Sequence, residues 1–318
     1  MFLKQLTKKI ENTNYFFDKG TMKIDKIWIY LAAILATLFW GFSFVWFKQA
    51  FLVYKPITVV FLRLVISSFF LIIYIKITSK NQRIARKDIK SFLLLAFFEP
   101  FCYFMGESFG LTFVSATVAA IIIATIPLFT PFFTYFFIKE KITIYGIIGL
   151  IISFFGVLLI VIKDYSSTST IKGVILMFIA VFSAVSFGII VKKLTIRYSV
   201  FTIVKWQNLL GILYFLPFFI IFEGSHFLSV KPNLSVIITI VKLAVFCSTL
   251  AFILMIYVIK KIGLINANIF ANLIPAFTAV IAYFVLKESL EIQKIIGILI
   301  VICGLFISQI PKFKKEKS

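Results

Sequence analysis

Two fifteen-residue stretches decide the fold of this chain: IPLFTPFFTYFFIKE at residues 126–140 and IPAFTAVIAYFVLKE at residues 274–288. Both begin with Ile-Pro, both end with Lys-Glu, and they lie 148 residues apart. A pair of glycines beyond each stretch recurs at the same spacing, Gly149 and Gly156 in the first copy and Gly297 and Gly304 in the second. The chain is therefore expected to contain two copies of one structural unit.

The composition assigns both copies to a membrane. Apolar residues make up 62% of the chain and charged residues 14%, whereas a soluble domain is roughly 45–50% apolar. Ten apolar runs reach about 20 residues, the length of a helix that crosses ~30 Å of hydrocarbon, and they lack the alternating polarity of barrel strands. We therefore predict an all-α integral membrane protein with ten transmembrane helices near residues 27–47, 56–75, 91–110, 115–137, 142–162, 171–191, 199–222, 235–259, 266–286 and 292–310.

The repeat divides these spans into two groups of five. The first copy is expected at residues 27–162 and the second at 171–310, between a tail of residues 1–26 and a basic tail of residues 311–318. Because five is odd, the second copy must enter the membrane in the opposite orientation to the first. Two inverted five-helix repeats are typical of secondary carriers, in which a central site is exposed alternately to either side.

The positive charge of the chain predicts its orientation. Lysine and arginine total 33 against 12 acidic residues. Of the 33, 23 fall in the two tails and in the loops that ten spans place on the same side of the membrane as the tails. By the positive-inside rule, both termini are expected in the cytoplasm and the protein in the cell (inner or plasma) membrane. The basic residues form no single stripe, which argues against nucleic acid as a partner. Met1 and Met22 both stand as candidate translation starts.

The order of several motifs resembles a known transporter family. Residues 40–44 (Trp-Gly-Phe-Ser-Phe) lie in the first span, Arg63 lies in the second, and residues 110–117 lead into the fourth. Ile-Pro, Lys-Glu and two glycines follow, and they recur in a second copy over about residues 173–307. This succession resembles the EamA domain of the drug/metabolite transporter superfamily.

The resemblance implies a ten-helix carrier in which spans one to four and six to nine surround a central substrate cavity. It implies export of small organic metabolites, such as amino acids, by alternating access and without a cofactor. A small-molecule substrate and the lipid bilayer are then the expected partners. The fifth and tenth spans are expected to support the bundle or to form a homodimer interface, since Gly149 and Gly156 lie along one seam of the fifth and allow close helix approach.

Charged residues inside the spans are the strongest candidates for a site. An ionised group near the bilayer centre costs at least ~2.5 kcal/mol, and the first copy holds three: Arg63, Glu99 and Glu107. Eight residues separate the two glutamates, which places them on roughly one helix face. One alternative is that Glu99 takes up and releases a proton during transport while Arg63 orients a carboxylate substrate or holds Glu99. The other is a permanent ion pair between Arg63 and a glutamate that pins two helices. In the second copy, Cys247 and Met255 stand at the matching positions.

Further candidates are aromatic or basic. Trp40 and Tyr103 are expected to give the cavity aromatic walls, which suit amphipathic solutes, although any one aromatic also serves as lipid-facing surface. Lys205 lies inside the seventh span and is followed two residues later by Gln207. Its ammonium group either snorkels to the headgroups or meets an anionic substrate.

The ninth and fourth spans add amides and prolines. Asn268 and Asn272 are four residues apart and are expected to share a helix face, where they contact the substrate or bond to a neighbouring helix. Pro275 follows them, and Pro127 and Pro131 lie in the related fourth span. Proline interrupts a helix, so these residues are expected to be hinges or kinks beside the cavity.

No motif of an enzyme accompanies these residues. The sequence lacks a His-Glu-x-x-His motif and a glycine-rich phosphate loop, and its three cysteines lack the spacing of metal ligands. We therefore expect neither catalysis nor a bound metal or cofactor. Two other classes stay open. One is a translocase of a lipid-linked carrier, since the basic residues 83–87 suit lipid headgroups as well as an ordinary cytoplasmic loop. The other is a non-transporting membrane protein.

Overall fold

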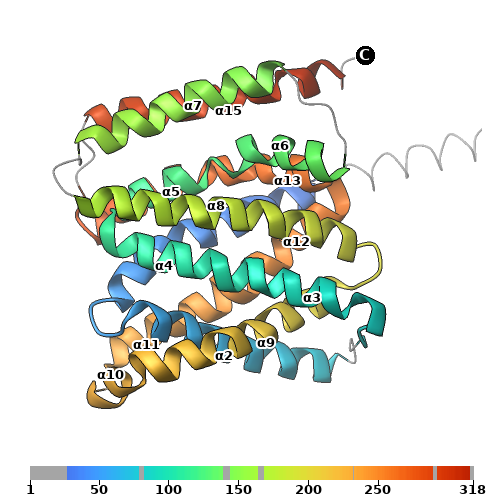
Figure 1. Ribbon diagram of the computed structural model, residues 1–318, viewed down its shortest axis with the longest axis vertical. Helices are drawn as coiled ribbons and strands as arrows, with labels where there is room; N and C mark the ends of the chain where they lie inside the picture. The colour runs from blue at the N-terminus through green and yellow to red at the C-terminus, as the bar shows by residue number, and fades with distance from the viewer. Residues whose placement is uncertain are drawn as a thin grey trace, which may run out of the picture.

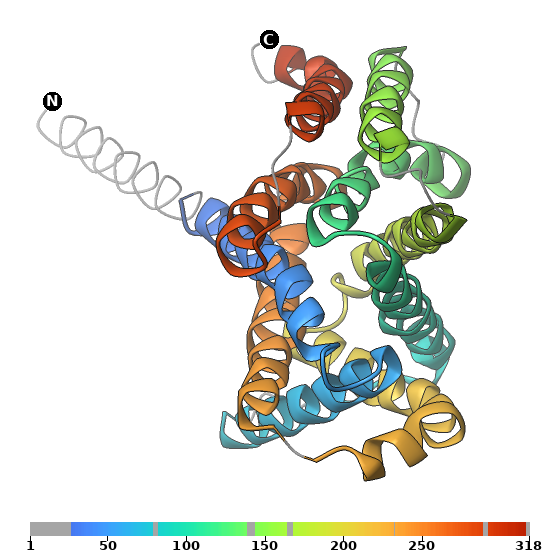
Figure 2. The same ribbon diagram turned by 90° about the vertical axis from the view of Figure 1, so that its left-hand side faces the viewer.

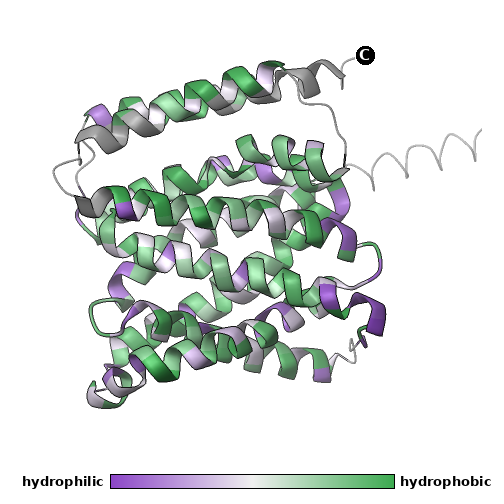
Figure 3. Ribbon diagram, viewed as in Figure 1, coloured by the Kyte–Doolittle hydropathy of each residue, from purple (hydrophilic) through white to green (hydrophobic). Residues whose placement is uncertain are grey.

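The computed structural model describes residues 27–78, 82–138, 144–163, 168–231, 233–288 and 292–315. Within these ranges all regular elements are helices, and they stack side by side across the view of Figure 1. They form eight helical segments that are long and apolar enough to cross a membrane. Figure 3 shows apolar residues along the helices and hydrophilic residues mainly toward their ends, where polar groups reach water or headgroups at low cost.

The helices of the first copy follow the order of the predicted spans. The copy begins with the helix Ile27–Ala50 and α2 (Pro56–Ile77). A 3₁₀ turn (Arg86–Asp88) then leads into α3 (Ile89–Ala96), a π-helical segment (Phe97–Cys102) and α4 (Tyr103–Phe113). The remaining helices are α5 (Ala116–Ile123), α6 (Ile126–Ile138) and α7 (Ile144–Lys163).

The second copy has the same order of helices, with more interruptions. It begins with α8 (Thr168–Leu194), α9 (Val200–Phe218), a π-helical segment (Phe219–Glu223) and α10 (Gly224–Ser229). The next span consists of α11 (Leu234–Lys242), a π-helical segment (Leu243–Leu250) and α12 (Ala251–Ile262). The last helices are α13 (Leu264–Asn268), a 3₁₀ segment (Ile269–Leu273), α14 (Ile274–Val285) and α15 (Ile292–Lys315).

The all-helical prediction is confirmed for the described residues. The eight long segments coincide with the predicted spans one to four and six to nine. The predicted fifth and tenth spans correspond to α7 and α15, whose apolar stretches, Ile144–Gly156 and Ile295–Gly304, are 10–17 residues long. Ten membrane spans therefore stay a prediction.

The helices α7 and α15 form a pair at the edge of the molecule, at the top of Figure 1 and Figure 2. The repeated glycines lie between them. A Cβ atom on Gly304 would lie 2.6 Å from the carbonyl oxygen of Gly149, and one on Gly156 would lie 2.9 Å from that of Gly297. Only a residue without a side chain fits so close to a neighbouring backbone. The order of these contacts shows that the two helices run antiparallel.

Two glutamates in the second copy bind the first turns of helices in the first copy. Glu223 accepts hydrogen bonds at the start of α2 from the amides of residues 57 and 58, at 3.2 and 2.7 Å, and from the Thr58 hydroxyl at 2.8 Å. Glu288 accepts the same set at the start of α5, from the amides of residues 116 and 117, at 2.8 and 3.2 Å, and from the Thr117 hydroxyl at 2.7 Å. First-turn amides have no acceptor within their helix, and the helix dipole favours an anion there. These two carboxylate caps join the copies.

The opposite end of the bundle is also joined across the copies. The side-chain oxygen of Gln82, which follows α2, accepts a hydrogen bond from the amide of Ser199, the N-cap of α9, at 2.9 Å. Beside it, Asp88 accepts hydrogen bonds from the Tyr198 hydroxyl at 2.8 Å and from the Arg197 guanidinium at 3.1 Å. The helices α2 and α9 are therefore fixed to each other at both ends.

Candidate functional site

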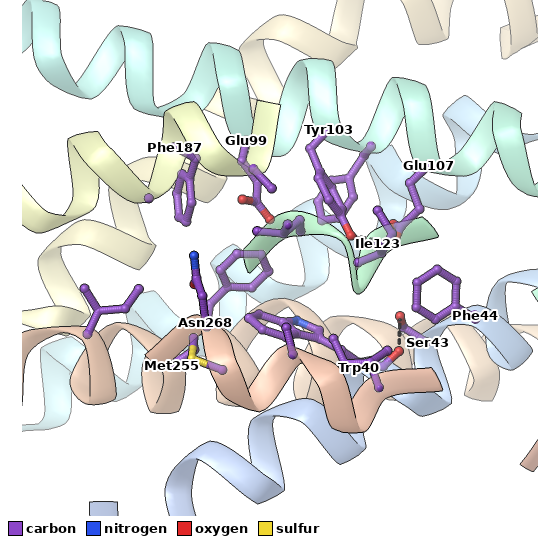
Figure 4. A pocket seen from close by; sticks show the side chains of 18 of the residues that line it. Trp40, Ser43, Phe44, Glu99, Tyr103, Glu107, Ile123, Phe187, Met255 and Asn268 are labelled. Carbon is purple, nitrogen blue, oxygen red and sulfur yellow. Dashed lines mark hydrogen bonds between the residues drawn. The ribbon is translucent and has the colours of Figure 1, made fainter. Parts of the chain in front are cut away.

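A cavity lies inside the bundle, between helices of both copies. Ligand pockets in proteins are mostly apolar and carry a few polar groups, and most of the side chains that line this cavity are likewise apolar. Figure 4 shows side chains that line it from several helices. Six of the nine substrate candidates in the sequence line the cavity: Trp40, Arg63, Glu99, Tyr103, Glu107 and Asn268. Three do not: Lys205, Gln207 and Asn272.

Glu99 lies where the span formed by α3 and α4 is broken. Its φ and ψ angles of −145° and 114° are extended inside an otherwise helical segment. The residue before a proline is disfavoured in the α region, and Pro100 has no N–H for the helical ladder. Broken helices occur at membrane depth where the freed backbone lines a cavity, and the Glu99 side chain lies against the cavity in Figure 4. Pro100 is the sequence signal for this break, whereas the spacing of the two glutamates assumes an unbroken helix.

The two glutamates differ in their partners. The hydroxyl of Tyr103 donates a hydrogen bond to Oε1 of Glu107 at 2.9 Å, across one helical turn. Among the residues that the structure describes, the carboxylate of Glu99 has neither a hydrogen-bond donor nor a cation within 4.0 Å. Glu99 is 6% exposed and Glu107 is 2% exposed. The cavity therefore contains one carboxylate with a hydrogen-bond partner and one without.

Arg63 is held by aromatic rings and a hydroxyl. Its guanidinium carbon lies 4.9 Å from the centroid of Phe47 and 4.4 Å from that of Phe104, which is cation–π geometry. Its Nε donates to the hydroxyl of Ser248 at 2.6 Å, and its buried Nη1 has no partner among the described residues. Within that part of the chain, neither glutamate lies within 4.0 Å of the guanidinium. The ion pair that was one alternative is therefore not formed here, because the rings and the hydroxyl hold Arg63 instead.

Aromatic rings form much of the cavity wall. Trp40 contacts Phe252 edge to face, with the ring centroids 5.4 Å apart, and Phe252 contacts Phe187 in the same way at 6.1 Å. Phe187 and Phe252 are cavity residues that sequence reasoning missed. A single ring carries no signal in a chain with 41 phenylalanines.

Asn268 and Asn272, which are expected to share a helix face, differ in their position relative to the cavity. Asn268 lines the cavity and donates a hydrogen bond to the hydroxyl of Thr130 at 3.0 Å. Asn272 does not line the cavity, and its buried Oδ1 has no partner among the described residues. The expectation assumes α-helical spacing, but residues 269–273 form a 3₁₀ helix, which has three residues per turn. Positions four apart therefore diverge.

Lys205 and Gln207 lie in α9, away from the cavity. The Lys205 ammonium lies 5.3 Å from the ring centroid of Trp206, and Gln207 is buried. The next residue, Asn208, donates to the hydroxyl of Ser67 at 2.7 Å, and Ser67 bonds the hydroxyl of Thr249 at 2.6 Å. This part of α9 therefore contributes an interhelical hydrogen-bond network.

The repeated prolines lie at helix breaks beside the cavity. Pro127 is the second residue of α6, after α5 ends at Ile123, and Pro275 is the second residue of α14, after the 3₁₀ segment. A proline ring clashes with the carbonyl four residues before it and so ends the preceding helix. Pro131 lies inside α6. Four residues at these two breaks line the cavity: Ile123, Ile126, Ala271 and Ile274.

The apolar spanning helices define a multi-pass membrane protein, and comparison with known proteins gives its family. The chain belongs to the EamA-like transporter family, whose model matches residues 27–162 and again residues 171–309. This agrees with the drug/metabolite transporter superfamily that the motifs resemble.

Relatives and a solved structure extend the comparison. An uncharacterized transporter of Archaeoglobus fulgidus is 27% identical over 89% of this chain and 98% of its own length. The uncharacterized transporter YetK of Bacillus subtilis is 27% identical over 79% of this chain and 77% of its own length. A solved crystal structure matches 89% of this chain and 97% of its own, with a TM-score of 0.67 and 13% identity, and so shares the fold. The family and its relatives point to a transporter rather than an enzyme.

Proposed function

We propose that this protein is a secondary active carrier that exports small organic metabolites, such as amino acids, across the cell membrane by alternating access. The observation that carries the proposal is the cavity, which helices of both copies enclose and in which the carboxylate of Glu99 lacks a partner among the described residues. An ionisable group that faces a cavity inside the membrane is typical of a transport pathway. The aromatic walls suit a solute with an apolar part.

An inverted pair of five-helix repeats would supply the two states of such a carrier. The contacts between α7 and α15 support this arrangement. Gly149 meets Gly304 and Gly156 meets Gly297, which is the reciprocal pairing that two oppositely oriented copies of one helix make. We place both termini in the cytoplasm, so that the end with the carboxylate caps faces outward. In this arrangement α7 and α15 support the bundle or form a homodimer interface.

Release of metabolites from proteoliposomes tests the proposal. Purified protein is reconstituted with a mixed metabolite pool inside, and the loss of each solute is followed by mass spectrometry with and without an imposed pH gradient. The expected result is selective loss of one chemical group of solutes, faster with the gradient and absent from protein-free liposomes. No selective loss from protein that is demonstrably folded would overturn the proposal and favour a lipid-linked cargo.

Replacing Pro127 or Pro275 with alanine is expected to slow export more than it lowers the yield of folded protein. Alanine restores an N–H group and lets the helix continue through the break, which reshapes the cavity wall and leaves most packing in place. Export rate per folded molecule and yield after gel filtration measure the two effects. Pro217→Ala in α9, away from the cavity, is the matched control. Equal losses of export rate and folded yield would mean that Pro127 and Pro275 contribute to packing of the fold and have no separate role in export.

A further inference from the structure

The ionisable side chains that line the cavity do not balance in charge. Arg63 is the one basic residue among the described lining residues, and Glu99 and Glu107 are the acidic ones. If both carboxylates are ionised, the cavity carries one excess negative charge. A charge buried in a medium of low dielectric is costly unless an opposite charge or hydrogen bonds accompany it. The described lining residues supply no further cation, so the excess charge calls for a proton or for the cationic group of a ligand.

The contacts identify Glu99 as the carboxylate whose negative charge has no compensating partner among the described residues. Glu107 accepts a hydrogen bond from Tyr103, and Glu99 accepts none among the described residues. Arg63 cannot compensate Glu99 by a change of rotamer without losing its bond to Ser248 and its contacts with the rings of Phe47 and Phe104. The other element that packs closely against the helix break and lines the cavity is α8, which contributes no charged side chain there. Lys205, on the adjacent α9, does not line the cavity.

The surroundings of Glu99 suit an organic cation. In Figure 4, Phe187 lies beside the carboxylate, and Trp40 and Asn268 lie across the cavity from it. Aromatic faces attract ammonium groups and also cover the apolar part of an amine. Arg63 is a poor site for an anion, because the residue is 1% exposed and its guanidinium lies against the rings of Phe47 and Phe104, so little of it faces a solute. The cavity therefore favours the cationic group of a solute over an anionic one.

We propose that Glu99 binds the protonated amine of the transported metabolite, and that a proton occupies Glu99 when no amine is bound. This inference rests on the proposed function and specifies the group that the cavity recognises. When an amine enters, the O–H bond of the Glu99 carboxyl group breaks and its proton leaves to water. The ammonium group keeps its own protons and pairs with the carboxylate. Amine and proton therefore compete for one site, which couples export of the amine to entry of a proton.

Four probes with one aromatic body and different polar groups test this inference by binding alone: 2-phenylethylamine, L-phenylalanine, phenylacetate and 2-phenylethanol. Isothermal titration calorimetry of the purified protein in two buffers of different ionisation enthalpy gives the affinity and the number of protons released. The amine is expected to bind about tenfold or more tightly than phenylacetate and 2-phenylethanol and to release up to one proton. Glu99→Gln is expected to lose about tenfold or more in amine affinity, together with the proton release.

Two variants make the result specific. Asp88→Asn removes an acid at the end of the bundle, outside the cavity, and is expected to bind the amine and release the proton as the wild type does. Glu99→Asp keeps a carboxylate and is expected to keep proton release, which guards against a Glu99→Gln variant that does not fold. Gel filtration and thermal unfolding confirm the folded state of each variant.

Three outcomes would overturn the inference. They are tighter binding of phenylacetate than of the amine, unchanged amine binding in folded Glu99→Gln, and proton release that is lost in Glu107→Gln but kept in Glu99→Gln. The binding result is independent of the transport assay. Amine binding with proton release but no metabolite export would reject the proposed function alone, and export without preference for amines would reject this inference alone.

Discussion

Replacement of Arg63 with methionine is expected to lower the stability of the folded protein more than any other single change at the cavity. Methionine is of similar length and keeps apolar contact with Phe47 and Phe104, but it removes the cation while Glu99 and Glu107 remain. Removing one partner of a close buried ion pair costs about 3–5 kcal/mol, and a smaller loss is expected here because neither described glutamate lies within 4.0 Å of the guanidinium. Thermal unfolding in detergent micelles, followed by tryptophan fluorescence, measures this loss.

Two further variants distinguish the effect of charge balance on stability from the effect of packing. The double variant Arg63→Met, Glu107→Gln removes one charge of each sign and is expected to be more stable than Arg63→Met alone. Arg63→Lys keeps the charge but not the planar guanidinium that contacts two rings and bonds Ser248, so an intermediate stability is expected. A double variant that is no more stable than Arg63→Met would contradict charge balance as the cause, as would a methionine variant as stable as the wild type.

Local signals in the sequence predicted most of the helices and several of the cavity residues. Long apolar runs are sufficient to locate membrane helices, because lipid demands about 20 consecutive residues that satisfy their own backbone hydrogen bonds. Charged residues are rare inside such runs, so Arg63, Glu99 and Glu107 were predicted as site residues. All three line the cavity. The break at Glu99 was not predicted, although Pro100 is a local signal for it through a rule that concerns only neighbouring residues.

The rest depends on contacts between residues far apart in the chain. The environment of Arg63 comes from Phe47, Phe104 and Ser248, which lie on three other elements. No local pattern says that rings rather than a glutamate surround this cation. The carboxylate caps are equally non-local, since 165 residues separate Glu223 from Thr58. A glutamate at the end of a helix is ordinary in sequence, and its role appears only when the start of another helix is packed beside it.

Replacing Glu223 and Glu288 together with alanine is expected to make the cavity reachable from the end of the bundle that carries the two carboxylate caps. Each carboxylate accepts three hydrogen bonds from the first turn of a helix in the other copy. A hydrogen bond to a charged group contributes about 1.5–3 kcal/mol. A change from 1:99 to 99:1 between two states takes about 5.5 kcal/mol. Loss of both caps is therefore large enough to favour a state in which α2 and α5 separate from the second copy.

A cysteine in the cavity reports this opening. Ser43 lines the cavity and is 3% exposed, so Ser43→Cys is introduced after the three native cysteines are replaced. Labelling of intact cells with a membrane-impermeant maleimide is expected to speed up about tenfold or more in the double alanine variant, and less in each single variant. Double replacement with glutamine, which keeps an acceptor oxygen at each cap, is the matched control and should cause a smaller increase. Equal labelling rates in all variants would show that the two caps stabilise the fold without controlling access. Faster labelling confined to inverted vesicles would place the opening at the cytoplasmic end and reverse the proposed orientation.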